Sequence, residues 1–213
     1  MRKEYNHKPF LENLLLGNRE KCLDIAHGFV ENETDIKVFY EQILTKALYE
    51  VGFLWENHKI SIATEHLASA IAENVINDFY LKLIRTVAVG KTAVVCNVKN
   101  EFHQLGTRLV SDVFEMNGWN AHILGANTTT EDILSFLESA KPDILAISMT
   151  LDFNLPLLLK MLNAIKEEYP EQAIIIGGQA FTQNTFDMAI DYYNVHVIKN
   201  LPELEAFIKK INE

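Results

Sequence analysis

Five short runs of apolar residues alternate with helical patterns through the second half of this 213-residue chain. The predicted strands cover residues 92–98, 121–124, 143–148, 173–177 and 195–198, and the predicted helices cover 104–117, 130–139, 154–168, 182–190 and 202–211. When a helix follows each strand, the strands lie parallel in one sheet with helices on its faces. The pattern therefore predicts an α/β fold, with a Rossmann-like (flavodoxin-like) five-stranded parallel sheet over residues 89–213.

The first half of the chain shows only helical spacing. Apolar residues recur every three or four positions from Thr34 to Leu54, and segments with similar spacing lie on either side, between residue 8 and about residue 85. Residues 57–61 interrupt the pattern before the last of these segments. Four amphipathic helices with short connections are typical of an antiparallel bundle, so we expect an N-terminal four-helix bundle over residues 1–88.

Charge and composition limit the partners of the chain. The net charge is −10, and the 19 Lys and Arg residues are scattered, whereas a nucleic-acid surface needs a basic stripe. We therefore expect no direct nucleic-acid binding. The sequence shows no signal peptide and no run of about 18 apolar residues, so it predicts a cytoplasmic protein without membrane contact. Cys22 and Cys96 lie far apart in apolar segments, as buried reduced thiols do.

Polar and small residues follow three of the predicted strands. The first strand is followed by Glu101, His103 and Gly106, the third by Ser148 and Thr150, and the fourth by Gly177 and Gly178. Each feature alone has an ordinary explanation: a loop histidine is usually solvated, Ser-x-Thr can cap a helix, and Gly-Gly is often a tight turn. In open α/β sheets, however, ligands bind at the carboxyl ends of the strands, where all three loops would meet.

The spacing of these residues resembles that of cobalamin (vitamin B12)-binding domains that hold the cofactor base-off, with a histidine on cobalt. Such domains carry Asp-x-His-x-x-Gly, Ser-x-Leu and Gly-Gly at matching intervals. Here 41 residues separate Gly106 from Ser148, and 26 separate Thr150 from Gly177. Glu101 stands where aspartate is usual, and Thr150 stands where leucine is usual.

The resemblance implies a role for each of these residues. His103 would be the lower axial ligand of cobalt, and Glu101 would hydrogen-bond the other ring nitrogen and so fix the tautomer. The extra methylene of Glu101 changes its reach to His103. Ser148, with Thr150 beside it, would hydrogen-bond the buried dimethylbenzimidazole of the cofactor. The glycines that would leave room for that tail are Gly106, Gly177 and Gly178.

A second motif lies in the predicted bundle. Nine residues separate Trp55 from the pair Glu65-His66. Taken alone, these residues read as a core anchor and an exposed helical pair. Their spacing resembles the cobalamin module of light-sensing repressors of carotenoid synthesis and of stand-alone B12 photoreceptors. The resemblance implies that Trp55 covers the upper face of the corrin and that Glu65 and His66 hydrogen-bond the adenosyl group.

One position departs from the photoreceptor pattern. The residue after Trp55 is Glu56, where the photoreceptors commonly have a histidine that takes the upper cobalt position after illumination. His58 and His66 are the alternatives in this chain.

Two functions fit these features. The first is a light-sensing or regulatory module that holds adenosylcobalamin between the two domains, in which light-triggered Co–C cleavage drives a conformational or oligomeric change. It is a sensor rather than an enzyme, has no catalytic residue, and acts through a homo-oligomer or a separate signalling partner. The alternative is a corrinoid methyl carrier of a methyltransferase system, with methylcobalamin bound. The Trp-x9-Glu-His spacing favours the sensor. Binding of an additional bilin stays open, because non-covalent bilin sites leave little trace in a sequence.

Overall fold

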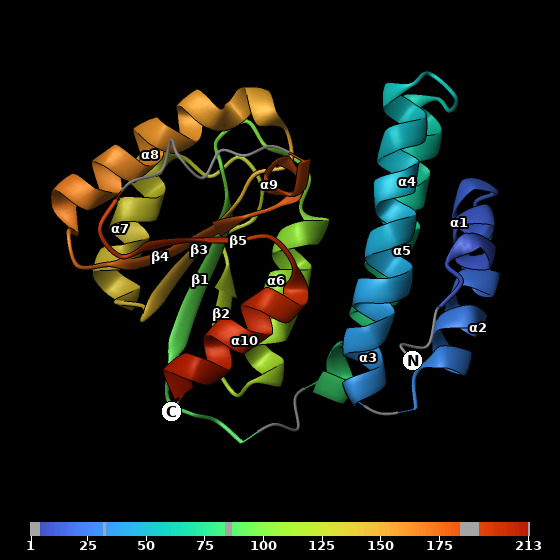
Figure 1. Ribbon diagram of the computed structural model, residues 1–213, viewed down its shortest axis with the longest axis horizontal. Helices are drawn as coiled ribbons and strands as arrows, with labels where there is room; N and C mark the ends of the chain where they lie inside the picture. Colours follow the sequence, from blue (N-terminus) through green and yellow to red (C-terminus); the bar gives the residue numbers. More distant parts are fainter. Residues whose placement is uncertain (1–4, 32, 84–86, 184–191, 213) are drawn as a thin grey trace. The chain divides into compact units, whose positions relative to one another are not determined.

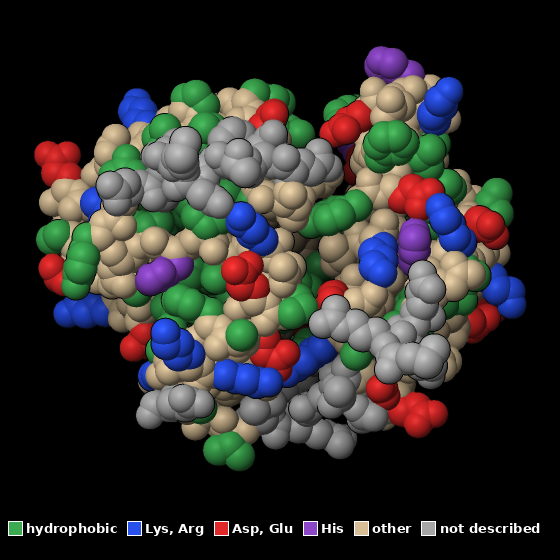
Figure 2. All heavy atoms as spheres, viewed as in Figure 1, with side chains coloured by type: hydrophobic (Ala, Val, Ile, Leu, Met, Phe, Trp, Pro, Cys, Tyr) green, Lys and Arg blue, Asp and Glu red, His purple; other side chains and the backbone are tan. Residues whose placement is uncertain are grey.

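The chain divides into two compact units, residues 1–84 and 85–213 (Figure 1). The computed structural model describes residues 5–31, 33–83, 87–183 and 192–212. None of the helices in these ranges combines the length and apolar character needed to cross a bilayer. On the face drawn in Figure 2, basic side chains are interspersed with acidic ones.

The first unit is a bundle of helices. Its elements are α1 (Lys8–Leu15), α2 (Arg19–Phe29), α3 (Glu33–Phe39), the π-helical segment η1 (Tyr40–Leu44), α4 (Thr45–Glu56) and α5 (Ile62–Leu83). Because α3, η1 and α4 follow one another without a break, they form one long helical rod, and α5 packs against α1, α2, α3 and α4 (Figure 1). The four expected helical segments are therefore present, although the sequence did not indicate the π-helical turn.

Three phenylalanine rings join the helices of this bundle. Phe39 lies edge-on to Phe10 and to Phe79, with ring centroids 5.4 Å and 5.7 Å apart. All three side chains are fully buried. Edge-to-face aromatic pairs add to the stabilisation that burial provides, so this cluster ties together α1, α3 and α5.

The second unit contains the predicted five-stranded parallel sheet, with strand order β2-β1-β3-β4-β5. The strands are β1 (Thr92–Asn97), β2 (Asn120–Ile123), β3 (Ile144–Ser148), β4 (Ala173–Gly177) and β5 (Val195–Ile198). The helices are α6 (Leu105–Met116), α7 (Thr130–Ala140), α8 (Leu155–Glu168), α9 (Gln179–Gln183) and α10 (Leu201–Asn212), and a 3-10 turn, η2 (Asp152–Asn154), precedes α8. The α/β prediction is confirmed.

Both faces of the sheet are covered, which is why its strands are almost wholly apolar. One face carries Val94, Cys96, Leu145, Ile147, Ile174 and Ile176, packed against α7 and α8. The other face carries Ala93, Val95, Ile144, Ala146 and Ile175, packed against α6 and α10 (Figure 1). Successive residues of each strand alternate between these two cores.

One helix differs from the prediction. The helix after β4 begins at Gln179 rather than at residue 182. Gly178 turns the chain immediately after the strand with a φ of +111°, a conformation that residues with a Cβ rarely adopt. Residues 184–190 of the predicted helix lie outside the described residues.

The strand order indicates at which edge of the sheet a ligand would bind. From β1 the chain moves outward to β2 and then returns to the other side of β1 to form β3, so the winding direction reverses between β1 and β3. In sheets of this kind the crevice lies outside the carboxyl ends of the strands at that reversal. At this edge Asn97 is in register with Ser148, and Ser148 is in register with Gly177.

Candidate functional site

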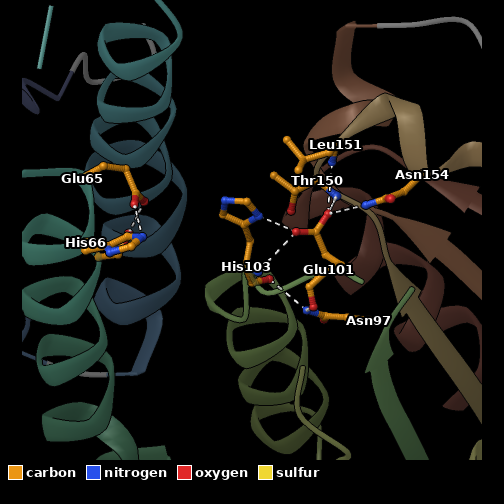
Figure 3. Close-up of polar contacts among 9 residues, drawn as sticks. Glu65, His66, Asn97, Glu101, His103, Thr150, Leu151 and Asn154 are labelled. Carbon is orange, nitrogen blue, oxygen red and sulfur yellow. Dashed lines mark hydrogen bonds and ion pairs between the residues drawn. The ribbon is translucent and has the colours of Figure 1, made fainter. Parts of the chain in front are cut away.

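A histidine and a buried glutamate lie side by side in the loop after β1 (Figure 3). Glu101 is fully buried, whereas the His103 side chain is 41% exposed. Nδ1 of His103 hydrogen-bonds Oε1 of Glu101, and the backbone N–H of His103 donates to the same oxygen at 3.3 Å. These two contacts fix the orientation of the imidazole ring. The added methylene of glutamate therefore does not prevent contact with the histidine.

The second carboxylate oxygen of Glu101 is held by the segment after β3. The backbone N–H groups of Thr150 and Leu151 donate to Oε2 at 3.1 Å and 3.2 Å, and Nδ2 of Asn154 lies 3.5 Å from it (Figure 3). A buried charge is costly unless it is paired and hydrogen-bonded, and here both oxygens have partners. Glu101 thus links the loop of the histidine to the β3–α8 segment.

Several opposing influences set the ionisation of Glu101. Burial acts to raise the pKa of this carboxyl, because it penalises the charged form. The hydrogen bond and charge of His103, together with the backbone N–H groups of His103 and Leu151, outweigh burial and hold the pKa below its ordinary value. An ionised carboxylate only accepts hydrogen bonds, so Nδ1 of His103 carries a proton. In a neutral ring the lone pair is then on Nε2, at the opposite edge, where it can coordinate a metal.

Sequence reasoning missed Asn154. This residue is 2% exposed and immediately precedes α8, where an asparagine is usually read as a helix cap. Its side chain does not cap α8 and is instead turned towards Glu101. The backbone amides of Thr150 and Leu151 were also missed, because backbone donors carry no side-chain signal. The contact made by Thr150 is through its backbone, so the leucine-to-threonine departure does not affect it.

The glycines of the site differ in why they are needed. A Cβ on Gly177 would lie 2.6 Å from the carbonyl oxygen of Ile198, and one on Gly178 would lie 2.4 Å from that of Met149. Close packing of the protein's own backbone therefore requires both residues, whatever the site binds. At Gly106, by contrast, the nearest atom to an added Cβ is the Oγ of Ser148 at 3.4 Å, an ordinary contact. The protein's own packing therefore does not require a glycine at position 106.

Matched glycine-to-alanine changes should separate these two cases. Gly178→Ala should lower the free energy of unfolding of the second unit by about 2–3 kcal/mol, because it combines backbone strain with overpacking. Gly106→Ala, in the first turn of α6, should leave it unchanged or raise it by about 0.5–1 kcal/mol, as alanine does in helices. Urea unfolding of the ligand-free protein measures both. A larger loss for Gly106→Ala than for Gly178→Ala would contradict this assignment.

The three bundle residues singled out in the sequence belong to the first unit. Trp55 is half-buried near the end of α4. Glu65, in the first turn of α5, accepts a hydrogen bond from Ser69 Oγ at 2.8 Å, and its Oε2 lies 3.6 Å from Nε2 of the exposed His66 (Figure 3). The structure thus brings Glu65 and His66 together. It groups Glu101, His103, Thr150, Ser148 and Gly106 in the second unit.

Comparison with curated proteins finds two relatives that are named as corrinoid proteins. The chain is 22% identical over 157 residues to dimethylamine corrinoid protein 1 of Methanosarcina acetivorans. The aligned region covers 72% of this chain and 74% of that protein. It is also 22% identical over 138 residues to dimethylamine corrinoid protein 3 of Methanosarcina mazei. That aligned region covers 63% of this chain and 83% of that protein.

Solved structures share the fold. The monomethylamine corrinoid protein of Methanosarcina barkeri superposes with a TM-score of 0.76 at 16% identity, over 95% of this chain and 96% of that one. A chain of the methanol:cobalamin methyltransferase complex of the same organism superposes with a TM-score of 0.53 at 15% identity, over 96% of this chain and 78% of that one.

Family comparison covers both units. A B12 binding domain matches residues 7–77, and a second family described as a B12 binding domain matches residues 91–198, which is 108 of the 213 residues. The resemblance inferred from the Glu-x-His-x-x-Gly, Ser-x-Thr and Gly-Gly spacing is therefore confirmed at the level of the family. This chain belongs to the B12 binding domain family.

Proposed function

We propose that this protein is a corrinoid carrier that serves a methyltransferase, with His103 as the axial ligand that the protein provides to cobalt. The observation that carries the proposal is the Glu101–His103 pair, which presents Nε2 of an oriented and partly exposed imidazole at the carboxyl edge of the sheet. When bound, a corrinoid supplies a cobalt centre that accepts and gives up a methyl group. The curated relatives reported above are corrinoid proteins of methylamine systems, which supports this function over light sensing.

The residues present fit a corrinoid. A metal that is already held by a macrocycle needs only one imidazole from the protein. The other ring nitrogen of His103 is hydrogen-bonded to the carboxylate of Glu101, as is usual for histidines that ligate metals. A Cβ on Gly106 would lie 3.4 Å from the Oγ of Ser148, so the absence of a side chain at this glycine would let the cofactor tail approach that hydroxyl. Ser148 is 6% exposed and would offer its hydroxyl to that tail.

Each residue of the pair has a distinct task in this proposal. Glu101 holds the proton on Nδ1 of His103, so that Nε2 offers its lone pair to the metal. Thr150, Leu151 and Asn154 hold Glu101 ionised and in place. Because a buried carboxylate makes the imidazole more basic, this arrangement strengthens the ligand. The remaining glycines, Gly177 and Gly178, maintain the backbone packing of the edge.

Light sensing is the second candidate, and the spacing of Trp55 and the Glu65–His66 pair supports it. In that case these residues would contact an adenosyl group, and adenosylcobalamin would be the bound form. In a methyl carrier the same residues would face a smaller upper ligand, and methylcobalamin would be the bound form. The partners differ accordingly: a methyltransferase for the carrier, and a second copy or a signalling protein for the sensor.

A two-arm experiment distinguishes the candidates. The protein is loaded in the dark with methylcobalamin or with adenosylcobalamin. The methyl form is mixed with a thiol and a methyltransferase that uses thiol acceptors, and demethylation is followed by visible absorption. The adenosyl form is illuminated and compared by size-exclusion chromatography before and after.

The carrier function predicts protein-dependent demethylation, loss of that reaction in His103→Ala, and no change of assembly with light. Retention of adenosylcobalamin alone, with a light-dependent change of assembly, would overturn the carrier function in favour of the sensor. Gly178→Ala is not a suitable control because it destabilises the edge itself. Lys141→Ala is suitable, because Lys141 is exposed at the end of α7, at the opposite end of the sheet from the site.

A further inference from the structure

A fully buried asparagine ends the otherwise apolar first strand. The four residues before Asn97 in β1 are Ala, Val, Val and Cys, all buried, and Asn97 itself is 0% exposed. Strand alternation places its side chain on the face of Ala93 and Val95, which α6 and α10 cover. A polar residue in such a core weakens it unless its hydrogen bonds are complete.

The two ends of the Asn97 amide differ. Its Nδ2 donates to the carbonyl oxygen of His103 at 3.1 Å and lies 3.5 Å from that of Glu101. Its Oδ1 is buried and has no hydrogen-bond partner among the described residues. The amide is thus used for its donor end only, and the acceptor end carries the cost of desolvation. Stability of the core alone would favour an apolar residue of the same shape.

The loop that Asn97 holds is the one that carries the histidine. It runs from Val98 to Gln104 and includes Asn100 in the left-handed region, with a φ of +68°. The Asn97 contact is made to the backbone of His103, whereas Glu101 contacts its ring and its N–H. The two contacts fix different parts of the same residue. Without the Asn97 contact, only the N–H side of the His103 backbone would be held, and its carbonyl side could still move.

We propose that Asn97 is a positioning residue, which clamps the backbone of His103 so that its imidazole is oriented for cobalt before the corrinoid binds. The part of this proposal in which Asn97 orients His103 for cobalt rests on the proposed function. The clamp itself is a property of the ligand-free protein. Preorganisation of this kind raises affinity, because the cost of ordering the loop is met in folding and not in binding.

The test compares Asn97→Leu, which keeps the shape and removes the donor, with Asn97→Thr, which suits a strand and keeps a hydroxyl donor. Ser111→Ala, at another buried polar side chain of the same unit, is the matched control. Urea unfolding of the ligand-free proteins should show Asn97→Leu to be within about 1 kcal/mol of the wild type, because removal of the unpartnered Oδ1 offsets the hydrogen bond lost to the His103 carbonyl. Affinity for methylcobalamin should fall about 10-fold in Asn97→Leu, less in Asn97→Thr, and not in Ser111→Ala.

A second readout needs no cofactor. In protein labelled with [15N]histidine, the ring nitrogens of His103 are identified by their loss in His103→Ala. The wild type should show a single tautomer with the proton on Nδ1. Asn97→Leu should show a mixture, because the ring of a less restrained His103 would leave Glu101 for part of the time. A single tautomer and unchanged affinity in Asn97→Leu would overturn the clamp. A wild type that shows one tautomer but binds no cobalamin would instead overturn the proposed function, and with it the ligand role of Asn97.

Discussion

Replacing Glu101 with alanine is expected to lower the free energy of unfolding of the second unit by about 3–5 kcal/mol. The carboxylate accepts hydrogen bonds from three backbone N–H groups, those of His103, Thr150 and Leu151, and alanine would remove the acceptor of all three inside a buried site. Few surface changes in this chain would approach that size, because exposed ion pairs contribute about 0–1 kcal/mol.

The measurement uses the two tryptophans of the chain, one in each unit. Trp119 is 3% exposed in the second unit, so its fluorescence in a Trp55→Phe background reports unfolding of that unit. Glu101→Gln is the matched variant, because its amide oxygen can still accept from Thr150 and Leu151 while its NH₂ faces His103. We expect Glu101→Gln to lower the free energy of unfolding of the second unit by about 1–2 kcal/mol. If the free energy of unfolding of Glu101→Ala lies within about 0.5 kcal/mol of the wild-type value, the role assigned to the buried carboxylate is wrong.

His103→Ala is expected to weaken cobalamin binding by more than about 100-fold, beyond the 10–100-fold loss typical of residues that only orient a metal ligand. The change removes the proposed axial nitrogen but little buried surface, because the side chain is 41% exposed. The bound spectrum should shift to a weakly ligated, base-off form. Binding is measured by equilibrium dialysis, and the spectrum is recorded at saturating cobalamin.

Glu101→Gln again serves as the comparison. Its NH₂ group favours the His103 tautomer with the proton on Nε2, which cannot coordinate, so binding should weaken although the histidine is retained. The loss should be smaller than for His103→Ala, because the ring can change tautomer at some cost. If His103→Ala retains both the affinity and the spectrum of the wild type, another residue or the cofactor's own base occupies the lower position.

The fold was predictable from the sequence because the sheet is buried on both faces. Strands such as Ile144–Ser148 and Ala173–Gly177 then consist of apolar runs that stand out against the helical spacing between them. The π-helical turn at Tyr40–Leu44 left no such trace, since it interrupts neither the apolar spacing nor the helix. The early start of α9 depended on the backbone angle of Gly178, which spacing alone does not reveal.

The contact between Glu101 and His103 was predictable, because two side chains of distinctive chemistry stand two positions apart in the chain. Asn154 was not, because an asparagine before a helix has a more ordinary explanation, and its contact with Glu101 joins residues 53 apart in the chain. Asn97 was read as part of a buried strand, and only its partners show what its amide does. Gly177 and Gly178 were interpreted as room for a ligand, whereas the carbonyl groups of Ile198 and Met149 account for both.

The central claim is that a nitrogen of this protein's His103 binds cobalt, and electron paramagnetic resonance of bound cob(II)alamin tests it most directly. Unpaired spin on cobalt couples to the axial nitrogen, and the splitting pattern depends on the nuclear spin of that nitrogen. With unlabelled cofactor and protein that contains [15N]histidine, the account predicts that each triplet of the unlabelled complex becomes a doublet, and that the doublet is absent in His103→Ala. A triplet that persists in the labelled protein would show that the cofactor's own base, and not His103, is the axial ligand.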